Sequence, residues 1–545
     1  MRVHAWAPAV AVVLLTSVSS IVHVQAAQEQ SKLKPKDIPR LMEEADKFIA
    51  ANDVPKAEAY LKAIIGLDPK QSGAAFKLGK LCEAQKDWDC TLQNYQLALG
   101  ALSGADKVQA HMGLAAGHFQ AGRFNDAAEQ SAAALALDPS QTQAHLVRAE
   151  SLVKLKSPDA LAASEAAVKA APDSAVAQAS LGEALLAAGR GPDAEAPLKR
   201  ALELDPKRPA TSAQLAGVLS AKGDHAGTIA AANQALAAEP GRKELYALRG
   251  RAYLATGDEA KALEDLYAAV AANPTDKGLL LALGTLQQKH GRFDAAAQQY
   301  RAVIEIDPRQ AEAQLGLAEI LLRNNDFENA RTPATSAASL LPESAPAQYA
   351  HGRILEHDKQ YDQALVAYGN AVRLDANLAG AYYGQGRILR EHKKDVPGAL
   401  AAMEKAAALD ANDPGVLTEF GAVLYEAKQV DRTIEVLDKA VATPDYANPM
   451  GLAVLGLALK DKKEYAKAIP PLEKAGELAP KWWMPRWGAA WSYFGQFKKG
   501  CPCGPEDQAR VQNMQAHYDE MVALGGKDPG LAERVKMLAS GLKIK

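Results

Sequence analysis

The sequence predicts an all-α, superhelical solenoid of antiparallel helix pairs, and three observations predict it. Proline recurs at intervals of 33 and then 34 residues, at Pro139, Pro172, Pro206, Pro240, Pro274, Pro308 and Pro342. A second column with nearly the same period holds only glycine or alanine, at Ala45, Gly79, Ala115, Ala149, Gly182, Ala216, Gly250, Gly284, Ala318, Gly352, Gly386, Gly421, Gly456 and Gly488. Leucines at helical spacing surround this column, as at Leu280, Leu283 and Leu286. A period of this length with helical spacing indicates stacked helix pairs.

Composition agrees with a folded helical chain. Hydrophobic residues make up 48% of the 545 positions and aromatic residues only 6%, so alanine supplies much of the apolar share. This composition excludes an intrinsically disordered chain. The 62 Lys and Arg nearly balance the 65 Asp and Glu, which argues against bulk nucleic-acid binding. Four cysteines exclude a disulfide-rich scaffold.

Residues 1–26 are typical of a secretory signal peptide. Arg2 and His4 precede an apolar stretch over residues 5–18, and small residues near Ala26 form a cleavage site. The apolar stretch is shorter than a membrane-spanning helix requires, which favours cleavage over an uncleaved anchor. We therefore expect an exported chain, periplasmic or extracellular in a bacterial envelope, with no transmembrane segment after cleavage. Residues 27–37 are expected to form a linker.

Each repeat is expected to hold a first helix, a turn and a second helix. A further alanine column stands twelve residues after the first column, as at Ala296 and Ala364, and aromatic residues such as Tyr300 and Tyr368 often follow it. Two small residues at this spacing let antiparallel helices touch. Glycine in the turn, as at Gly122, accepts the left-handed conformation that ends a helix. Asp-Pro then ends the second helix.

This pattern resembles the tetratricopeptide repeat, a 34-residue helix-turn-helix unit. The resemblance covers residues 38–480 as thirteen units, followed by a divergent terminal repeat and capping helices over residues 481–545. It implies a right-handed superhelix that binds protein or peptide partners. Five prolines in or near second helices predict kinks, at Pro192, Pro197, Pro397, Pro470 and Pro471. Two apolar stripes are expected to cap the last repeat, the first formed by Val511, Met514, Tyr518, Met521 and Val522 and the second by Leu531, Val535, Leu538 and Leu542.

No constellation typical of catalysis or cofactor binding is present in the sequence. It contains no phosphate-binding glycine loop, no Gly-x-Ser-x-Gly elbow and no paired-histidine metal motif. His111 and His118 lie seven residues apart on one helix and are interpreted as packing residues. We therefore expect a chain that is not an enzyme and that holds no cofactor or metal.

The four cysteines form two local pairs. Cys82 and Cys90 flank a predicted turn, which makes a disulfide geometrically reasonable. Cys501 and Cys503 lie in a Cys-Pro-Cys loop, for which a structural disulfide is the leading interpretation. Idle thiols and a redox or soft-metal pair remain the alternatives for this loop. The last alternative would make the chain a redox or metal-binding protein.

The predicted binding groove rests on the family resemblance, which places the first helix of each repeat along the concave face. The positions expected to face the groove hold Tyr349 and Arg353 in one repeat, and Tyr383, Arg387 and Arg390 in the next. Tyrosine and arginine are enriched in binding hot spots, and the arginines predict an acidic or carboxylate-bearing partner. The alternative is that the tyrosines pack between repeats while the arginines lie beside neighbouring acids.

Trp482 and Trp483 form a possible second contact patch, because Trp487 and Trp491 fall at positions expected to be buried. The leading hypothesis is an exported, non-catalytic scaffold or adaptor that binds protein or peptide partners. It would act in the assembly of an envelope secretion, surface-polymer or cell-wall complex. A non-catalytic subunit of a larger enzyme is a further alternative.

Overall fold

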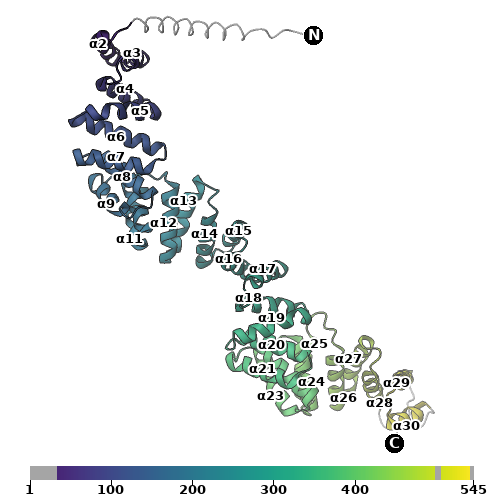
Figure 1. Cartoon of the computed structure of the whole chain (residues 1–545). Helices are drawn as coiled ribbons and strands as arrows, with labels where there is room; N and C mark the ends of the chain where they lie inside the picture. Colours follow the sequence, from purple (N-terminus) through teal and green to yellow (C-terminus); the bar gives the residue numbers. More distant parts are fainter. Residues whose placement is uncertain (1–32, 498–504, 540–545) are drawn as a thin grey trace, which may run out of the picture. The chain divides into compact units, whose positions relative to one another are not determined.

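The computed structural model describes residues 33–497 and 505–539, and within these ranges the chain contains helices and no strands (Figure 1). It divides into two compact units, residues up to 272 and residues from 273 onward. The expected signal peptide, Cys501, Cys503 and Leu542 lie outside the described residues. The all-α repeat fold is confirmed.

The first unit begins with the short helix η1 (Pro35–Asp37) and holds seven helix pairs. Their helices are α2 (Ile38–Ala50), α3 (Val54–Leu67), α4 (Ser72–Ala84), α5 (Trp88–Ala98), α6 (Gly104–Gln120), α7 (Phe124–Leu137), α8 (Thr142–Lys154), α9 (Ala160–Ala170), α10 (Ala175–Ala187), α11 (Gly191–Leu204), α12 (Pro209–Lys222), α13 (His225–Ala238), α14 (Lys243–Thr256) and α15 (Glu259–Ala272). The short helix η2 (Leu99–Ala101) follows α5.

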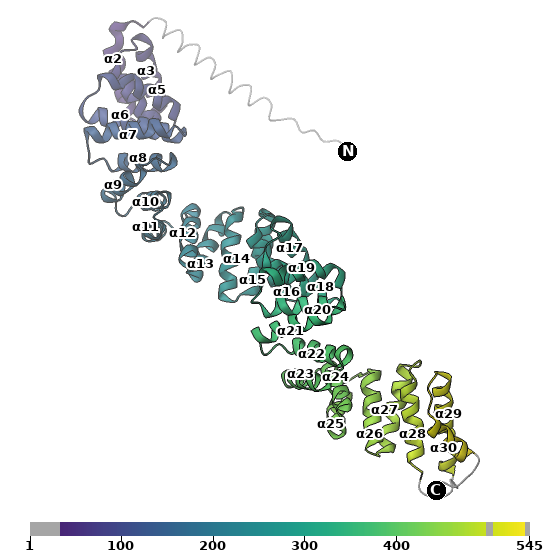
Figure 2. The same ribbon diagram turned by 60° about the horizontal axis from the view of Figure 1, so that its bottom comes forward.

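The second unit holds seven further pairs and a last helix, within its described residues. These helices are α16 (Lys277–Lys289), α17 (Phe293–Ile306), α18 (Ala311–Arg323), α19 (Phe327–Leu340), α20 (Ala345–His357), α21 (Tyr361–Leu374), α22 (Ala379–Ile388), α23 (Val396–Leu409), α24 (Pro414–Glu426), α25 (Val430–Val441), α26 (Pro449–Asp461), α27 (Tyr465–Leu478), α28 (Trp483–Gly495), α29 (Pro505–Ala523) and α30 (Pro529–Ala539). Each even-numbered helix from α2 to α28 packs on the helix that follows it, and Figure 2 shows the order from a second direction.

The turns between paired helices have the expected left-handed residue. Gly122 has φ of +69° and Gly257 has φ of +82°, and Asn325 adopts φ of +56° at the same place in its repeat. An aspartate often follows and caps the second helix, as Asp326 does by accepting a hydrogen bond from the Asn329 backbone. These local signals explain why each helix ends where it does.

The small-residue column exists because a large side chain of the second helix packs on it. Tyr368 lies between Gly352 of its own repeat and Gly384 of the next, and a Cβ on either glycine would lie within 2.7 Å of the ring. Tyr95 lies in the same way between Gly79 and Gly113, and Tyr300 between Gly284 and Gly316. At these three places the glycines leave the space that the tyrosine ring occupies.

The repeat that begins with α22 is one residue longer than the repeat before it, and a π-helix absorbs the difference. Gly386 and Gly421 are 35 residues apart, whereas Gly352 and Gly386 are 34 apart. The π-helix η3 (Leu389–Lys393) extends α22, and Lys394 with φ of +57° ends it. A single-turn π-bulge is the usual way for a helix to hold an inserted residue.

The prolines for which kinks are predicted do not end their helices. Pro197 lies inside α11, and Pro470 and Pro471 lie inside α27, and both helices continue through them as single elements. Pro192 and Pro397 fall in the first turn of their helices, where the missing amide hydrogen costs nothing.

Helices α29 and α30 cover the end of α28. Their buried residues form one apolar cluster with Ala490, consisting of Met514, Met521, Leu531, Val535 and Leu538. Val522 is 47% exposed, so its assignment to the first stripe is wrong; it points away from the face that the other members share. Asp528 ties the cap together, because it accepts hydrogen bonds from the indoles of Trp487 at 2.7 Å and Trp491 at 2.8 Å and from the Leu531 backbone of α30.

Candidate functional site

Three consecutive repeats of the second unit line an open, polar pocket of about 350 Å³. We call it the arginine–histidine pocket after its charged lining, which consists of Arg353, Glu356, His357, Arg387, Glu391 and His392. These residues come from α20, α22 and η3, the first helices of two neighbouring repeats.

Two imidazole rings of the pocket are stacked on aromatic rings. His357 lies 4.3 Å from the Phe327 ring, with an interplanar angle of 6°. His392 lies 3.7 Å from the Tyr361 ring, with an angle of 12°. Phe327 and Tyr361 are the first residues of second helices. His357 is the last residue of α20, and His392 lies in η3, one residue before its end. The repeat geometry therefore places one stacked pair on each side of the pocket and holds both rings in position.

Arg353 also lines the pocket and forms no ion pair within the part of the chain that the structure describes. Its guanidinium lies 5.6 Å from the Phe327 ring centroid and donates one hydrogen bond to the Leu322 carbonyl at 3.2 Å. No acidic side chain of the described residues forms an ion pair with it, since the nearby Glu356 is engaged by Arg387. Most of the guanidinium donors of Arg353 are thus left for a ligand.

Arg387 is neutralised within the chain. Its Nη2 lies 2.6 Å from Glu356 Oε1, and the Tyr368 hydroxyl donates to the other oxygen of Glu356 at 2.7 Å. Burial works against the charge on Arg387, but the Glu356 carboxylate outweighs it and raises the pKa of the guanidinium. Burial and the same carboxylate raise the pKa of Tyr368 far above its ordinary value. The contacts among Arg387, Glu356 and Tyr368 hold the side chains of Arg387 and Glu356 in place along one wall of the pocket.

The other residues of the predicted groove serve packing and internal ion pairing. Tyr349 is half-buried in the apolar cluster around Tyr368, and Tyr383 packs on the cluster of α23 and α24. Arg390 pairs with Glu419 at 2.8 Å and with Glu391 and Glu426, at 12% side-chain exposure. Arg353 and Arg387 therefore line the pocket, whereas Arg390 forms ion pairs with three acidic side chains and is not among the lining residues.

Comparison with protein families identifies the fold. The model described as tetratricopeptide repeat matches residues 42–107, 112–160, 153–209, 214–277, 281–347 and 349–414. The chain belongs to the tetratricopeptide repeat (TPR) family. Proteins of this family generally mediate protein–protein interactions as scaffolds. None of the curated proteins compared with the chain matches it.

Solved structures with similarity to the chain include other TPR proteins. The APC/C hetero-tetramer Cut9–Hcn1 has 16% identity and a TM-score of 0.35, over 86% of this chain and 96% of that chain. Yeast Tom70 has 17% identity and a TM-score of 0.28, over 82% and 99%. PilF of Pseudomonas aeruginosa has 20% identity and a TM-score of 0.34, over 38% and 95%. Likenesses of this strength say nothing about partners.

Trp482 and Trp483, the predicted second contact patch, pack on different apolar clusters. Trp482 packs on the cluster of Leu452, Ala453 and Ala475, whereas Trp483 packs on the separate cluster of the C-terminal cap. Both are half-buried. A contact surface that includes the exposed sides of both rings stays a prediction.

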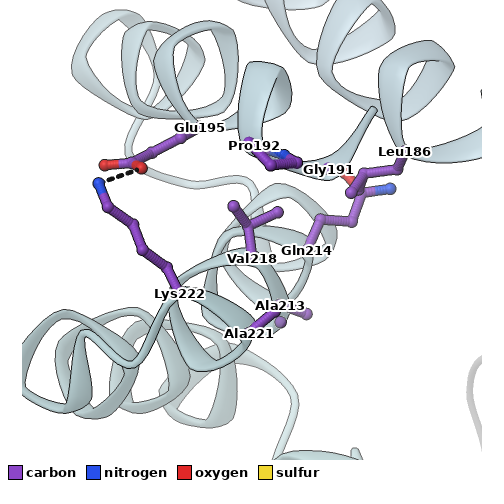
Figure 3. A pocket seen from close by; sticks show the side chains of 10 residues that line it. Leu186, Gly191, Pro192, Glu195, Ala213, Gln214, Val218, Ala221 and Lys222 are labelled. Atoms are coloured by element: carbon purple, nitrogen blue, oxygen red, sulfur yellow. Dashed lines mark hydrogen bonds and ion pairs between the residues drawn. The ribbon is translucent and has the colours of Figure 1, made fainter. Parts of the chain in front are cut away.

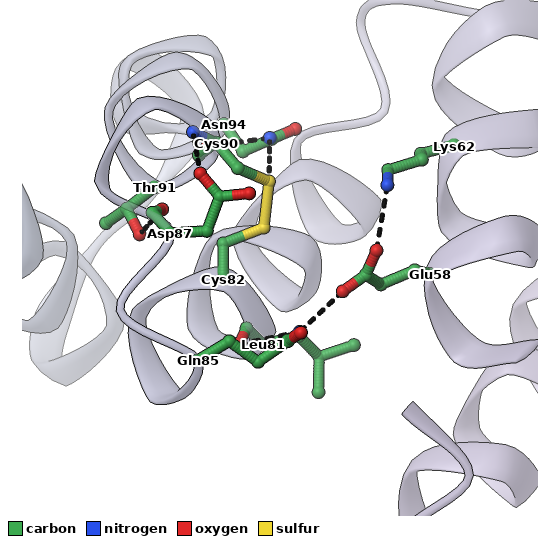
Figure 4. Close-up of a disulfide and its surroundings, with 9 residues drawn as sticks. All are labelled: Glu58, Lys62, Leu81, Cys82, Gln85, Asp87, Cys90, Thr91 and Asn94. Carbon is green, nitrogen blue, oxygen red and sulfur yellow. Dashed lines mark hydrogen bonds and ion pairs between the residues drawn. A yellow bond between two sulfur atoms is a disulfide. The ribbon is translucent and has the colours of Figure 1, made fainter. Parts of the chain in front are cut away.

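Cys82 and Cys90 form a disulfide across the turn of the second TPR unit, with their Cα atoms 5.7 Å apart (Figure 4). Asn94 donates to the Cys90 carbonyl at 2.8 Å.

His111 is buried and contacts Gln130 at 2.8 Å, in agreement with a packing role. The described residues contain no group of three or more metal-ligating side chains arranged to hold an ion, and no helix among them is long and apolar enough to cross a membrane.

Sequence reasoning missed the aromatic and histidine members of the pocket. The signal was available, since Phe327 and Tyr361 are 34 residues apart and His357 and His392 are 35 apart. They lie at helix ends beside the turns, outside the groove positions considered. The inserted residue of η3 also shifts His392 out of the 34-residue register.

Proposed function

We propose that this TPR chain is an exported, non-catalytic scaffold that holds an acidic segment of a protein partner in the arginine–histidine pocket. The observation that carries the proposal is Arg353, a cation without an acidic partner in a pocket built by three repeats. An arginine left in this state can bind a carboxylate through two parallel hydrogen bonds.

The surroundings of Arg353 favour a bound carboxylate in two ways. The guanidinium lies over Phe327, and the stacked His357 and His392 are held in fixed orientations, so little side-chain freedom is lost on binding. The ring nitrogens can add donors beside the guanidinium. Glu356 and Glu391 occupy other parts of the lining and favour a single carboxylate over a highly charged anion.

Two features support a setting outside the cytoplasm. Residues 1–26 have the composition of a secretory signal peptide, and the Cys82–Cys90 disulfide is a bond that persists in oxidising compartments. We place the scaffold in a bacterial envelope, where it would join components of a secretion, surface-polymer or cell-wall assembly.

The proposal is tested by affinity capture from an envelope extract of the source organism. The chain without residues 1–26 is compared with Arg353→Gln and with the control Arg373→Gln, which changes an arginine that is 62% exposed and outside the pocket. Far-UV circular dichroism verifies that all three are equally helical. Loss of the same partner in Arg353→Gln alone supports the pocket, and retention of that partner contradicts it. A stoichiometric enzyme among the captured proteins would favour the alternative of a non-catalytic enzyme subunit.

A further inference from the structure

The first unit contains a second hollow of a different chemical kind. It measures about 580 Å³ and lies between α10, the start of α11 and α12 (Figure 3). Its walls are Leu186, Pro192, Ala213, Val218 and Ala221, with Gly217 among them. The walls are thus largely apolar, as in pockets that hold the hydrophobic part of a ligand.

Gly217 is unusual among the glycines of the chain. It lies in the middle of α12, where glycine is less favourable than alanine by about 0.5–1 kcal/mol. A Cβ added there would meet no atom within 4 Å, although every other described glycine more than one turn inside an α-helix has a neighbour within that distance. Neither packing nor a left-handed φ requires this glycine. Its effect is to leave the hollow open.

The polar groups at the rim limit what can enter. Glu195 is held by Lys199 and Lys222, each at 2.8 Å, so these charges are largely satisfied within the chain (Figure 3 shows the Lys222 contact). Gln214 has no hydrogen bond from its side chain to any described residue. Its amide offers one acceptor and two donors, a complement that fits the N–H and C=O of a peptide backbone.

We propose that this hollow binds one large apolar side chain of an extended peptide segment, with Gln214 bonded to the backbone of that segment. The inference rests on the proposed function, namely that the TPR array binds protein partners, and adds a second recognition site with a different preference. An uncharged side chain matches a hollow whose rim charges are already paired, whereas the arginine–histidine pocket selects a carboxylate.

A phage-displayed library of random linear peptides tests the inference, with the chain lacking residues 1–26 as the target. Selected peptides are then measured against Gly217→Phe, which fills the hollow, Gly217→Ala, the matched control, and Arg353→Gln. We expect one class of peptides with a shared large apolar residue to bind Gly217→Phe roughly tenfold or more weakly, because burial of such a side chain is lost. These peptides should bind Gly217→Ala and Arg353→Gln within about twofold of the parent. If Gly217→Phe does not fold, Ala221→Phe fills the hollow from an exposed position of the same helix.

The outcomes separate the two proposals. If no selected peptide weakens on Gly217→Phe while acidic peptides weaken on Arg353→Gln, the hollow is not a site and the proposed function stands. If apolar peptides depend on Gly217 and none depends on Arg353, the hollow is supported and the carboxylate pocket fails. If the chain selects no peptide at all, both proposals are contradicted.

Discussion

A single methyl group should destabilise the fold at Gly384 and stabilise it at Gly217. Both positions are mid-helix glycines, so Gly→Ala gains about 1 kcal/mol of helix propensity at each. At Gly217 nothing opposes this gain, because the new Cβ meets no atom within 4 Å. We expect Gly217→Ala to raise the free energy of unfolding by about 0.5–1 kcal/mol.

At Gly384 the new Cβ would lie 2.6 Å from the ring of Tyr368. The ring cannot retreat, since a Cβ on Gly352 would already lie 2.7 Å from its opposite edge and Tyr368 is 1% exposed. Overpacking of this kind costs about 1–3 kcal/mol. After the helix-propensity gain of about 1 kcal/mol, a net loss of up to about 2 kcal/mol remains.

Urea unfolding followed by far-UV circular dichroism measures the net effect in each variant. Because stability in repeat arrays is local, hydrogen exchange of amides in α20–α22 and in α12 shows where the change occurs. Gly384→Ala should speed exchange in α20–α22, and Gly217→Ala should slow it in α12. In the Tyr368→Leu background the cost of Gly384→Ala should shrink, as expected for coupled neighbours. Shifts of the same sign in the two single variants would refute the packing explanation of the small-residue column.

Three further predictions follow from other contacts. Tyr368→Phe removes a hydrogen bond to a carboxylate and should lower the free energy of unfolding by about 1–2 kcal/mol in urea titrations. Cys82→Ser/Cys90→Ser should cost about 2.5 kcal/mol on the loop-entropy estimate, and a reducing agent should abolish the difference from the parent. Burial disfavours the charge on Asp528, but hydrogen bonds from Trp487 and other donors hold its pKa below the ordinary value. The stability that the Asp528 carboxylate contributes should therefore be complete above about pH 4 and be lost as pH falls through the lowered pKa. Tryptophan emission should report this transition, and Asp528→Asn should lack it.

The fold could be predicted from the sequence because the same local signals, namely the small-residue column, the turn glycine and the Asp-Pro step, recur from repeat to repeat. The paired helices begin with α2 at Ile38, and α28, α29 and α30 follow the last regular pair in the described residues. Gly122 and the Asp-Pro steps end helices for reasons that are local in the chain. The assignment of Val522 was wrong because the apolar period continues one residue past the face that α28 covers.

The candidate site was less accessible to sequence reasoning. The alternative in which the tyrosines pack between repeats describes Tyr349 and Tyr383. Only the structure shows that Arg390 forms ion pairs with three acidic side chains. Ion pairs between neighbouring repeats depend on side-chain directions that a repeat alignment does not contain. The hollow in the first unit also escaped sequence reasoning, since Ala213 and Gly217 line it and their small side chains leave the space open.

The central claim is that Arg353 binds a carboxylate of a protein partner. The most direct test is a calorimetric titration of the captured partner against the parent, Arg353→Gln and Arg373→Gln, each at low and high salt. We predict that Arg353→Gln weakens the Kd by roughly tenfold or more and reduces its dependence on salt, because a charge-assisted hydrogen bond contributes about 1.5–3 kcal/mol. The Arg373→Gln control should match the parent. Equal Kd values for the parent and Arg353→Gln at both salt concentrations would contradict the claim.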